Sequence, residues 1–204
     1  PQSGVFSPHV RRHQSVVRKG DHFMCASFPD RLADLLQDGD IIDFGAIPPA
    51  VNHHLQQGVA AYYDDRPASE GHFRAALAED PTCLIPWFCL TKINTYQGFL
   101  SAAAEAAGGG LASAARQGNF PADWDVLAAD LPPHWAEQMA RPDSSQRFYT
   151  YMLKALAFVK LKAAALTEAE HLLAMAARLD PDDRVGHSVI RALALRLRSD
   201  ESVE

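Results

Sequence analysis

The chain contains little cysteine and no long apolar run. Its three cysteines, Cys25, Cys83 and Cys89, form a low and odd count that does not suggest a disulfide scaffold. No apolar run reaches the roughly 18 residues that a membrane-spanning helix needs. The basic N-terminal residues are not followed by the apolar stretch of a secretory signal. We therefore expect a cytoplasmic protein that does not bind membranes.

Familiar signatures of catalytic and metal sites are missing as well. No C-x-x-C or H-E-x-x-H spacing occurs, so His53 and His54 do not form a standard zinc motif with the cysteines, which we expect to be structural. The glycines at 108–110 lack the Gly-Lys-Ser/Thr end of a phosphate-binding loop, and no G-x-S-x-G elbow occurs. We expect no enzyme activity, no metal and no cofactor.

An excess of basic residues is also absent. The formal net charge of −6 argues against a nucleic-acid partner. The charge is uneven, because residues 30–145 hold 16 acidic and 6 basic side chains whereas residues 150–198 hold 5 and 8. Such asymmetry is found on ordinary solvated surfaces and on surfaces that select a partner by charge. The sequence leaves both interpretations open.

Helical periodicity is what the sequence does contain. Apolar residues make up 48% of the chain, alanine is abundant and β-branched residues are few, which favours helices. Apolar side chains recur at helical spacing, and Gly, Pro and Asn residues separate the periodic segments. The pattern predicts helices over residues 30–39, 50–64, 68–79, 84–107, 143–164, 167–179 and 184–198.

Local signals predict where these helices bend or end. Gly98 is expected to be a joint, and the three glycines at 108–110 are expected to end the helix and form a flexible joint. Residues 111–142 have an irregular pattern with short helical pieces. We therefore expect an insert over residues 108–142.

Capping signals mark the C-terminal helices. The D-x-x-Q spacing from Asp143 and the T-x-x-E spacing from Thr167 are typical of capping boxes. Asp182 or Asp183 is expected to cap the last helix. Apolar residues recur every four positions in that helix, which predicts one packed face: Val185, Val189, Leu193 and Leu197.

Two stretches one hundred residues apart share a pattern. Residues 70–81 read EGHFRAALAEDP, and residues 170–181 read EHLLAMAARLDP. Both place Glu, a large apolar residue, Ala and then Asp-Pro at equivalent positions. Proline is poorly tolerated inside a helix, so each Asp-Pro ends one helix before the next begins. This arrangement is typical of one helical hairpin that is used repeatedly.

With these features the chain resembles the tetratricopeptide repeat family, whose 34-residue unit is a pair of antiparallel helices. The match is best over residues 150–183, at Leu153, Leu156, Ala157, Ala169, Leu173, Ala176 and Pro181. It is weaker over residues 50–83, at Gly58, Ser69, Phe73, Ala76 and Pro81. Residues 84–117 start on the pattern and then depart from it, at Trp87, Leu90 and Ala103.

The resemblance implies an all-α fold, a superhelical array of helical hairpins over about residues 50–198. Small residues would let the helices approach closely, large ones would fill the space between neighbours, and hairpins would stack to bury their apolar faces. The alternative is a generic helical bundle. The predicted organisation is a loose tail at 1–23, one domain at 24–198 with repeats at 50–83, 84–117 and 150–183, the insert, a cap helix at 184–198 and frayed residues 199–204.

The resemblance also implies a concave groove that is lined by the first helix of each hairpin and holds an extended peptide. The residues expected there from the first repeat are Asn52, Leu55, Gln56 and Tyr62. Those from the second are Phe88, Cys89, Lys92 and Tyr96, and those from the third are Tyr151, Lys154, Phe158 and Lys162. Lys154 and Lys162 share a helix face, where they are either solvated or placed to bind a carboxylate. The aromatic residues are either core or part of a peptide-binding wall.

Three functions follow from these features. The first is a non-catalytic adaptor or assembly factor that binds a protein or peptide. The second is a structural subunit that forms a homodimer by burying exposed apolar end faces. The third is a metal- or cofactor-handling protein that uses the insert, through Asp123, Trp124, Asp125, Asp130, His134 and Trp135.

Overall fold

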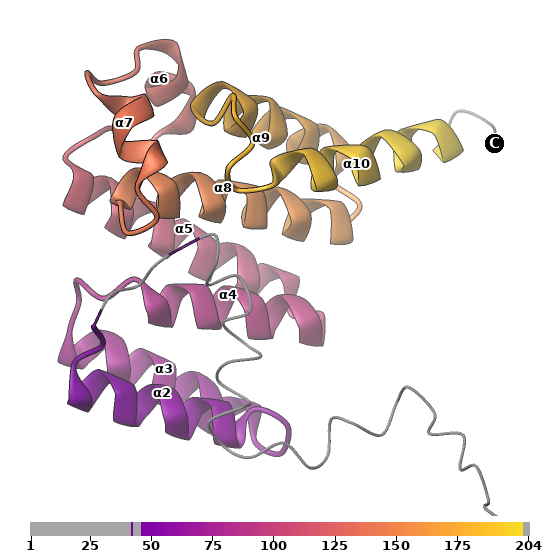
Figure 1. Ribbon diagram of the computed structural model, residues 1–204. Helices are drawn as coiled ribbons and strands as arrows, with labels where there is room; N and C mark the ends of the chain where they lie inside the picture. The colour runs from indigo at the N-terminus through magenta and orange to yellow at the C-terminus, as the bar shows by residue number, and fades with distance from the viewer. Residues whose placement is uncertain (1–41, 43–45, 202–204) are drawn as a thin grey trace, which may run out of the picture.

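The computed structural model describes residue 42 and residues 46–201, and within these the chain forms helices and no strand (Figure 1). The predicted all-α class is confirmed. The expected tail at 1–23 and the helix at 30–39 lie outside the described residues. The helices are α2 (Pro49–Ala61), α3 (Arg66–Glu79), α4 (Ile85–Gln97), α5 (Leu100–Gly118), α6 (Trp124–Ala129), α7 (Trp135–Ala140), α8 (Ser145–Lys162), α9 (Leu166–Leu179) and α10 (His187–Glu201).

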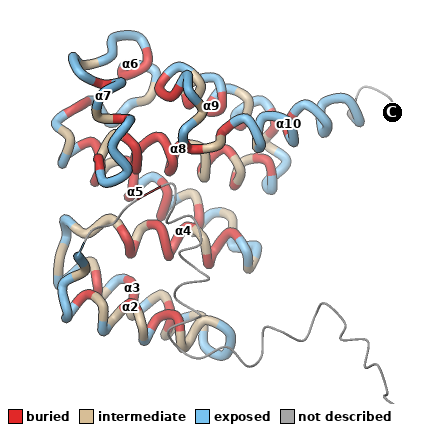
Figure 2. The backbone as a smooth tube through the Cα atoms, in the orientation of Figure 1, coloured by how far each residue is buried: buried red, intermediate tan, exposed pale blue. Residues whose placement is uncertain are grey.

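The longer helices pack as consecutive pairs. Helix α2 packs on α3, α4 on α5, and α8 on α9, and short turns join the members of each pair. Helix α5 also packs along α8, so the second and third pairs form one continuous core. Figure 2 shows buried residues on the facing sides of these helices. Helix α10 packs on α9 and α8 at the C-terminal end.

The first pair is held by a close approach that the sequence predicts. Gly58 of α2 faces Phe73 of α3, and a Cβ atom at Gly58 would lie 2.9 Å from the Phe73 ring. The Ser69 hydroxyl donates a hydrogen bond of 2.7 Å to the Gly58 carbonyl oxygen. Phe73 has no exposed surface. The small residue in α2 therefore lets a phenylalanine ring fill the space between the helices.

The expectation that glycines 108–110 end a helix is wrong. The joint at Gly98 exists, with φ of 81°, but α5 then runs from Leu100 to Gly118 without a break. A Cβ atom at Gly109 would lie 2.4 Å from the Trp87 ring of α4, and one at Gly110 would lie 3.0 Å from the Met152 side chain of α8. Glycine costs a helix about 1 kcal/mol relative to alanine. Close packing against two neighbouring helices offsets that cost.

The predicted insert begins later than expected and is folded onto the third pair. It follows Gly118 and contains α6 and α7, which pack on α9 and α8 respectively. The Trp135 indole N–H donates a hydrogen bond of 2.8 Å to the Leu179 carbonyl oxygen. The Tyr149 hydroxyl donates one of 2.8 Å to the Ala122 carbonyl oxygen. The Phe120 ring lies edge-on to both aromatic rings, with centroids 5.2 Å apart.

Two predicted capping boxes are wrong. The N-cap of α8 is Ser144, whose hydroxyl accepts from the Arg147 backbone N–H, while Asp143 pairs with Arg141. Helix α9 begins at Leu166, and its N-cap residue makes no side-chain cap. The tight turn after α8 starts α9 early, so Thr167 already lies within the first turn.

The last helix is also placed differently from the prediction. It begins at His187 and continues to Glu201, so residues 199–201, which were expected to be frayed, are helical, and residues 202–204 lie outside the described residues. Ile190 and Ala194 pack on the core, whereas most of the predicted stripe is exposed: Val189 is 70% exposed, Leu193 37% and Leu197 39%. None of the helices in the described ranges is both long and apolar enough to cross a membrane.

Candidate functional site

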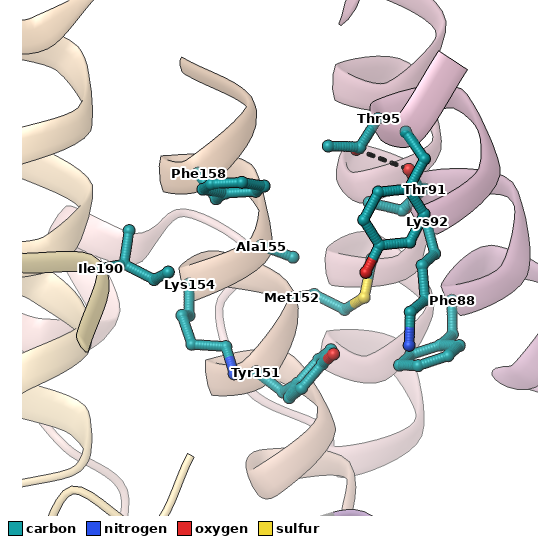
Figure 3. A pocket seen from close by; sticks show the side chains of 11 residues that line it. Phe88, Thr91, Lys92, Thr95, Tyr151, Met152, Lys154, Ala155, Phe158 and Ile190 are labelled. Carbon is teal, nitrogen blue, oxygen red and sulfur yellow. Dashed lines mark hydrogen bonds between the residues drawn. The ribbon is translucent and has the colours of Figure 1, made fainter. Parts of the chain in front are cut away.

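A groove between α4 and α8 brings half of the predicted binding residues together (Figure 3). Six of the twelve line it, and they come from two helices that are about sixty residues apart in sequence: Phe88, Lys92, Tyr96, Tyr151, Lys154 and Phe158. Ile190 of α10 closes one side. The structure thus places around a single depression six residues that the resemblance to the repeat family implies for a groove.

Helical periodicity explains why these side chains converge. Positions 88, 92 and 96 recur every four residues along α4, and positions 151, 154 and 158 recur every three or four along α8, so each set lies on one face. Prolines in the first turns of α2, α3 and α4 are compatible with helix initiation. The opposite faces of α4 and α8 are packed against α5. The groove therefore lies on the side of α4 and α8 that α5 does not cover.

The floor of the groove is apolar. Phe88 and Tyr151 are 2% and 7% exposed, and their ring centroids lie 5.5 Å apart. The Thr91 and Thr95 hydroxyls donate hydrogen bonds of 2.8 and 2.6 Å to the carbonyl oxygens of Trp87 and Thr91 on the same helix. Their polar atoms thus turn back onto α4. The surface left for a ligand consists of rings, methyl groups and the Met152 side chain.

Basic groups lie at the edges of this apolar floor. The Lys92 ammonium is 5.2 Å from the Phe88 ring centre, and the Lys154 ammonium is 4.2 Å from that of Tyr151. Both are distances at which a cation is attracted to an aromatic face. Lys154 also donates a hydrogen bond of 2.7 Å to the Val185 carbonyl oxygen. Together these groups favour an apolar ligand that carries negative charge at its edges.

The size of the groove distinguishes between kinds of ligand. Its volume is about 110 Å³. Sites for small molecules and cofactors are usually about 300–1,000 Å³. The space instead fits about one apolar side chain, because an engineered cavity of about 150 Å³ holds a benzene molecule. An anchoring side chain of a peptide suits it better than an organic cofactor.

Four predicted binding residues lie elsewhere: Asn52, Gln56, Tyr62 and Lys162. Asn52 accepts a hydrogen bond from Gln56 on α2, and Tyr62, at the C-terminal end of α2, packs against Tyr63 with ring centroids 4.5 Å apart. Burial, followed by the nearby tyrosines, raises the pKa of Tyr62. Lys162 lies at the end of α8, 6.0 Å from the Phe158 ring centre, and does not line the groove.

Two further residues expected in the groove are core residues. Leu55 and Cys89 have no exposed surface. Cys89 follows Phe88 directly and is rotated about 100° from it around the helix axis, which turns the thiol away from the groove. Burial raises the pKa of the Cys89 thiol well above its usual range, as expected for a structural thiol. The expectation that these two side chains face a ligand is wrong.

Several residues of the groove escaped the sequence prediction. Thr91, Thr95, Met152 and Ala155 share a face with the predicted residues and were within reach of the same helical spacing. Ile190 carried no such signal, because its place in the groove depends on how α10 packs across α8.

A second cluster, of acidic and histidine side chains, caps α10. A carboxylate oxygen of Asp180, a carboxylate oxygen of Asp183 and a ring nitrogen of His187 lie within 4.8 Å of one another. Asp180 accepts from the Val185 N–H at 2.8 Å, and Asp183 accepts from the Ser188 N–H at 3.0 Å, which confirms Asp183 as a cap of the last helix. Burial opposes the charged form of Asp183, but hydrogen bonds from Ser188 and the neighbouring His187 leave its pKa lowered.

The polar residues of the insert do not meet in one site. Asp123 caps α6 by accepting from two backbone N–H groups. Asp125 lies 2.8 Å from His171, and His134 lies 3.2 Å from Glu137. Within the described residues, these side chains each make separate local contacts. The groove is therefore the better candidate site.

Comparison with protein-family models, with curated proteins and with solved structures finds no match to this chain.

Proposed function

We propose that this chain is a non-catalytic adaptor that binds a protein or peptide partner in the α4/α8 groove of a tetratricopeptide-like helical array. The observation that carries the proposal is the convergence of six predicted binding residues on one depression, which is lined by the first helices of two successive pairs. The apolar floor and lysine edges favour a partner segment with a large apolar side chain and neighbouring carboxylates.

The packing of the helices supports the repeat-like arrangement. Each of the pairs α2/α3 and α8/α9 contains small residues at the predicted contact positions, among them Gly58, Ala157 and Ala176, which are all buried. Helices α3 and α9 end immediately before the two Asp-Pro steps. These features favour stacked hairpins over a bundle whose helices pack without a repeat.

Lys92→Glu should weaken partner binding about tenfold, which corresponds to about 1.4 kcal/mol. The ammonium lies beside Phe88 at the edge of the groove, and reversal of its charge would repel a carboxylate there. Lys154 is a poorer probe, because its hydrogen bond to Val185 makes it part of the fold as well. A partner found by affinity capture and then purified would be titrated by calorimetry at two salt concentrations.

The matched control is Arg178→Glu, which makes the same charge change at an exposed position on α9 that does not line the groove. It should leave the affinity for the partner within twofold. Both variants should retain the thermal unfolding midpoint of the parent protein. Equal affinity of the parent and Lys92→Glu proteins for the partner would refute the proposed binding site.

Self-association is a second candidate function, which the exposed apolar side chains of α10 favour. Val189, Leu193, Leu195 and Leu197 are 37–70% exposed on one short helix. If this surface joins two copies, light scattering at micromolar concentration should give twice the 22.3 kDa mass of the chain. Val189→Glu together with Leu193→Glu should then restore the single mass, whereas Leu131→Glu, at an apolar residue exposed outside α10, should not. A single mass in the parent protein would exclude this candidate.

A further inference from the structure

The turn between α9 and α10 brings three potential metal ligands together. A carboxylate oxygen of Asp180, one of Asp183 and a ring nitrogen of His187 lie within 4.8 Å of one another. Asp180 directly follows the last residue of α9, and His187 is the first residue of α10. The cluster therefore joins the end of one helix to the start of the next. None of the three residues lines the α4/α8 groove, so the cluster is separate from the proposed binding site.

The spacing of the polar atoms in this cluster fits one small cation. Two atoms that bind the same ion through bonds of about 2.0–2.2 Å lie roughly 2.8–3.5 Å apart. The His187 Nε2 atom lies 3.4 Å from the Asp183 Oδ1 atom. The backbone carbonyl oxygen of Asp180 lies 2.9 Å from the same nitrogen and adds a further oxygen to the donor set. Both distances are those of neighbouring ligands on one ion.

Asp180 gives an independent reason to expect a cation here. The residue is 1% exposed, and its Oδ2 atom accepts from the Val185 N–H at 2.8 Å. The other oxygen of the same carboxylate, Oδ1, is buried and accepts no hydrogen bond from the described residues. A buried carboxylate oxygen without a partner is costly, and buried charges in proteins are either paired or bound to metal ions. A cation between Asp180, Asp183 and His187 would remove that cost.

The surroundings of the cluster predict a moderate affinity. Burial lowers the pKa of Arg147, and the Asp180 carboxylate opposes that shift, so the two charges attract each other. The Arg147 guanidinium donates to the carbonyl oxygens of Met139 and Arg184, at 3.0 and 3.5 Å, and as a positive charge it repels a cation. The Nδ1 atom of His187 is buried without a partner among the described residues, whereas metal-binding histidines usually donate from their second nitrogen. We therefore expect micromolar rather than nanomolar binding.

We propose that Asp180, Asp183 and His187 bind one divalent transition-metal ion of the Zn²⁺ type. A ring nitrogen beside carboxylate oxygens is a usual donor set for zinc, whereas Mg²⁺ and Ca²⁺ prefer oxygen ligands alone. The ion ties the end of α9 to the first residue of α10 and so stabilises the packing of the last helix. This metal site goes beyond the adaptor function and does not depend on it.

Calorimetric titration of the chelator-treated full chain with ZnCl₂ tests the site. The parent protein should bind one equivalent, and Asp183→Asn should bind it at least about tenfold more weakly, the loss that changes at a metal site typically produce. Asparagine caps helices about as well as aspartate, so this variant removes the ligand charge and keeps the start of α10. The matched control is Asp182→Asn, the same change at the neighbouring exposed residue, which pairs with Arg184. It should leave the affinity for zinc unchanged.

Thermal unfolding gives a second measurement. Because an ion that binds only the folded state raises the unfolding midpoint, ZnCl₂ should raise it in the parent and Asp182→Asn proteins and not in Asp180→Asn. MgCl₂ at the same concentration should raise it in none of them. Equal zinc binding by the parent, Asp180→Asn and Asp183→Asn proteins would overturn the proposal, since the ion would then be held by histidines elsewhere. Absence of zinc binding by the parent protein would overturn it as well.

Discussion

Gly109→Ala should destabilise the protein, whereas Gly108→Ala, one residue earlier in the same helix, should stabilise it. A Cβ atom at Gly109 would lie 2.4 Å from the Trp87 ring, which is far inside normal contact distance. Forcing one extra carbon into a packed contact typically costs about 1–3 kcal/mol. At Gly108 no atom lies within 4 Å, and alanine is favoured over glycine in a helix by about 1 kcal/mol. Because both positions lie in α5, the helix preference for alanine applies to both, and the two variants should differ by the packing cost, roughly 1–3 kcal/mol.

Urea unfolding followed by circular dichroism would measure both free energies of unfolding. The pair Gly58→Ala and Gly71→Ala gives the same comparison in the first helical pair, because Gly58 faces Phe73 and Gly71 has no neighbour within 4 Å. If Gly109→Ala proved as stabilising as Gly108→Ala, the contact between α5 and Trp87 would be wrong. A flexible joint at these glycines would also give similar effects at both positions.

Trp135→Ala should lower the free energy of unfolding by about 3–5 kcal/mol. Trp135 lies in α7, is 4% exposed and packs edge-on against Phe120. Its indole N–H also donates to the carbonyl oxygen of Leu179, the last residue of α9. The substitution would leave a cavity and remove the partner of that carbonyl. Such a loss is a large fraction of the total stability of a typical domain.

Trp135→Phe separates the two contributions, because it keeps an aromatic ring and removes the hydrogen bond. Its effect should be smaller, about 1–3 kcal/mol. Val126→Ala, at a side chain 56% exposed on α6, should change stability by no more than about 0.5 kcal/mol. Denaturant unfolding and hydrogen exchange over residues 119–144 would measure these effects. An unchanged stability in Trp135→Ala would mean that the insert does not support the α8/α9 pair.

Features that depend on neighbours in sequence were predictable. The Asp-Pro steps end α3 and α9 because proline cannot continue a helix, and Gly98 ends α4 because it adopts a positive φ. The groove residues of α4 and α8 followed from the resemblance to the tetratricopeptide repeat family, which implies that the first helix of each hairpin lines a groove. The prediction was wrong for Leu55 and Cys89, because the packing of neighbouring helices decides which face of a helix is buried and both side chains lie on the buried face.

Features that depend on distant partners were not predictable. The glycines at 108–110 suggest a break until Trp87 and Met152 are seen to occupy the space that side chains would need. The regular spacing of apolar residues in α10 suggests a packed stripe, yet the helix contacts the core through Ile190 and Ala194. In both cases the local pattern is real, and the neighbouring helices decide its meaning.

Lys154 connects the groove to the last helix of the chain. Its ammonium holds the Val185 carbonyl just before α10, and Ile190 of α10 forms part of the groove. If the proposed partner placed a carboxylate beside this ammonium, the carboxylate would weaken the hydrogen bond to Val185. Partner binding and the packing of α10 would then be reciprocally coupled, so that a change at either one would alter the free energy of the other. The C-terminal helix would report, by its rate of amide exchange, whether the groove is filled.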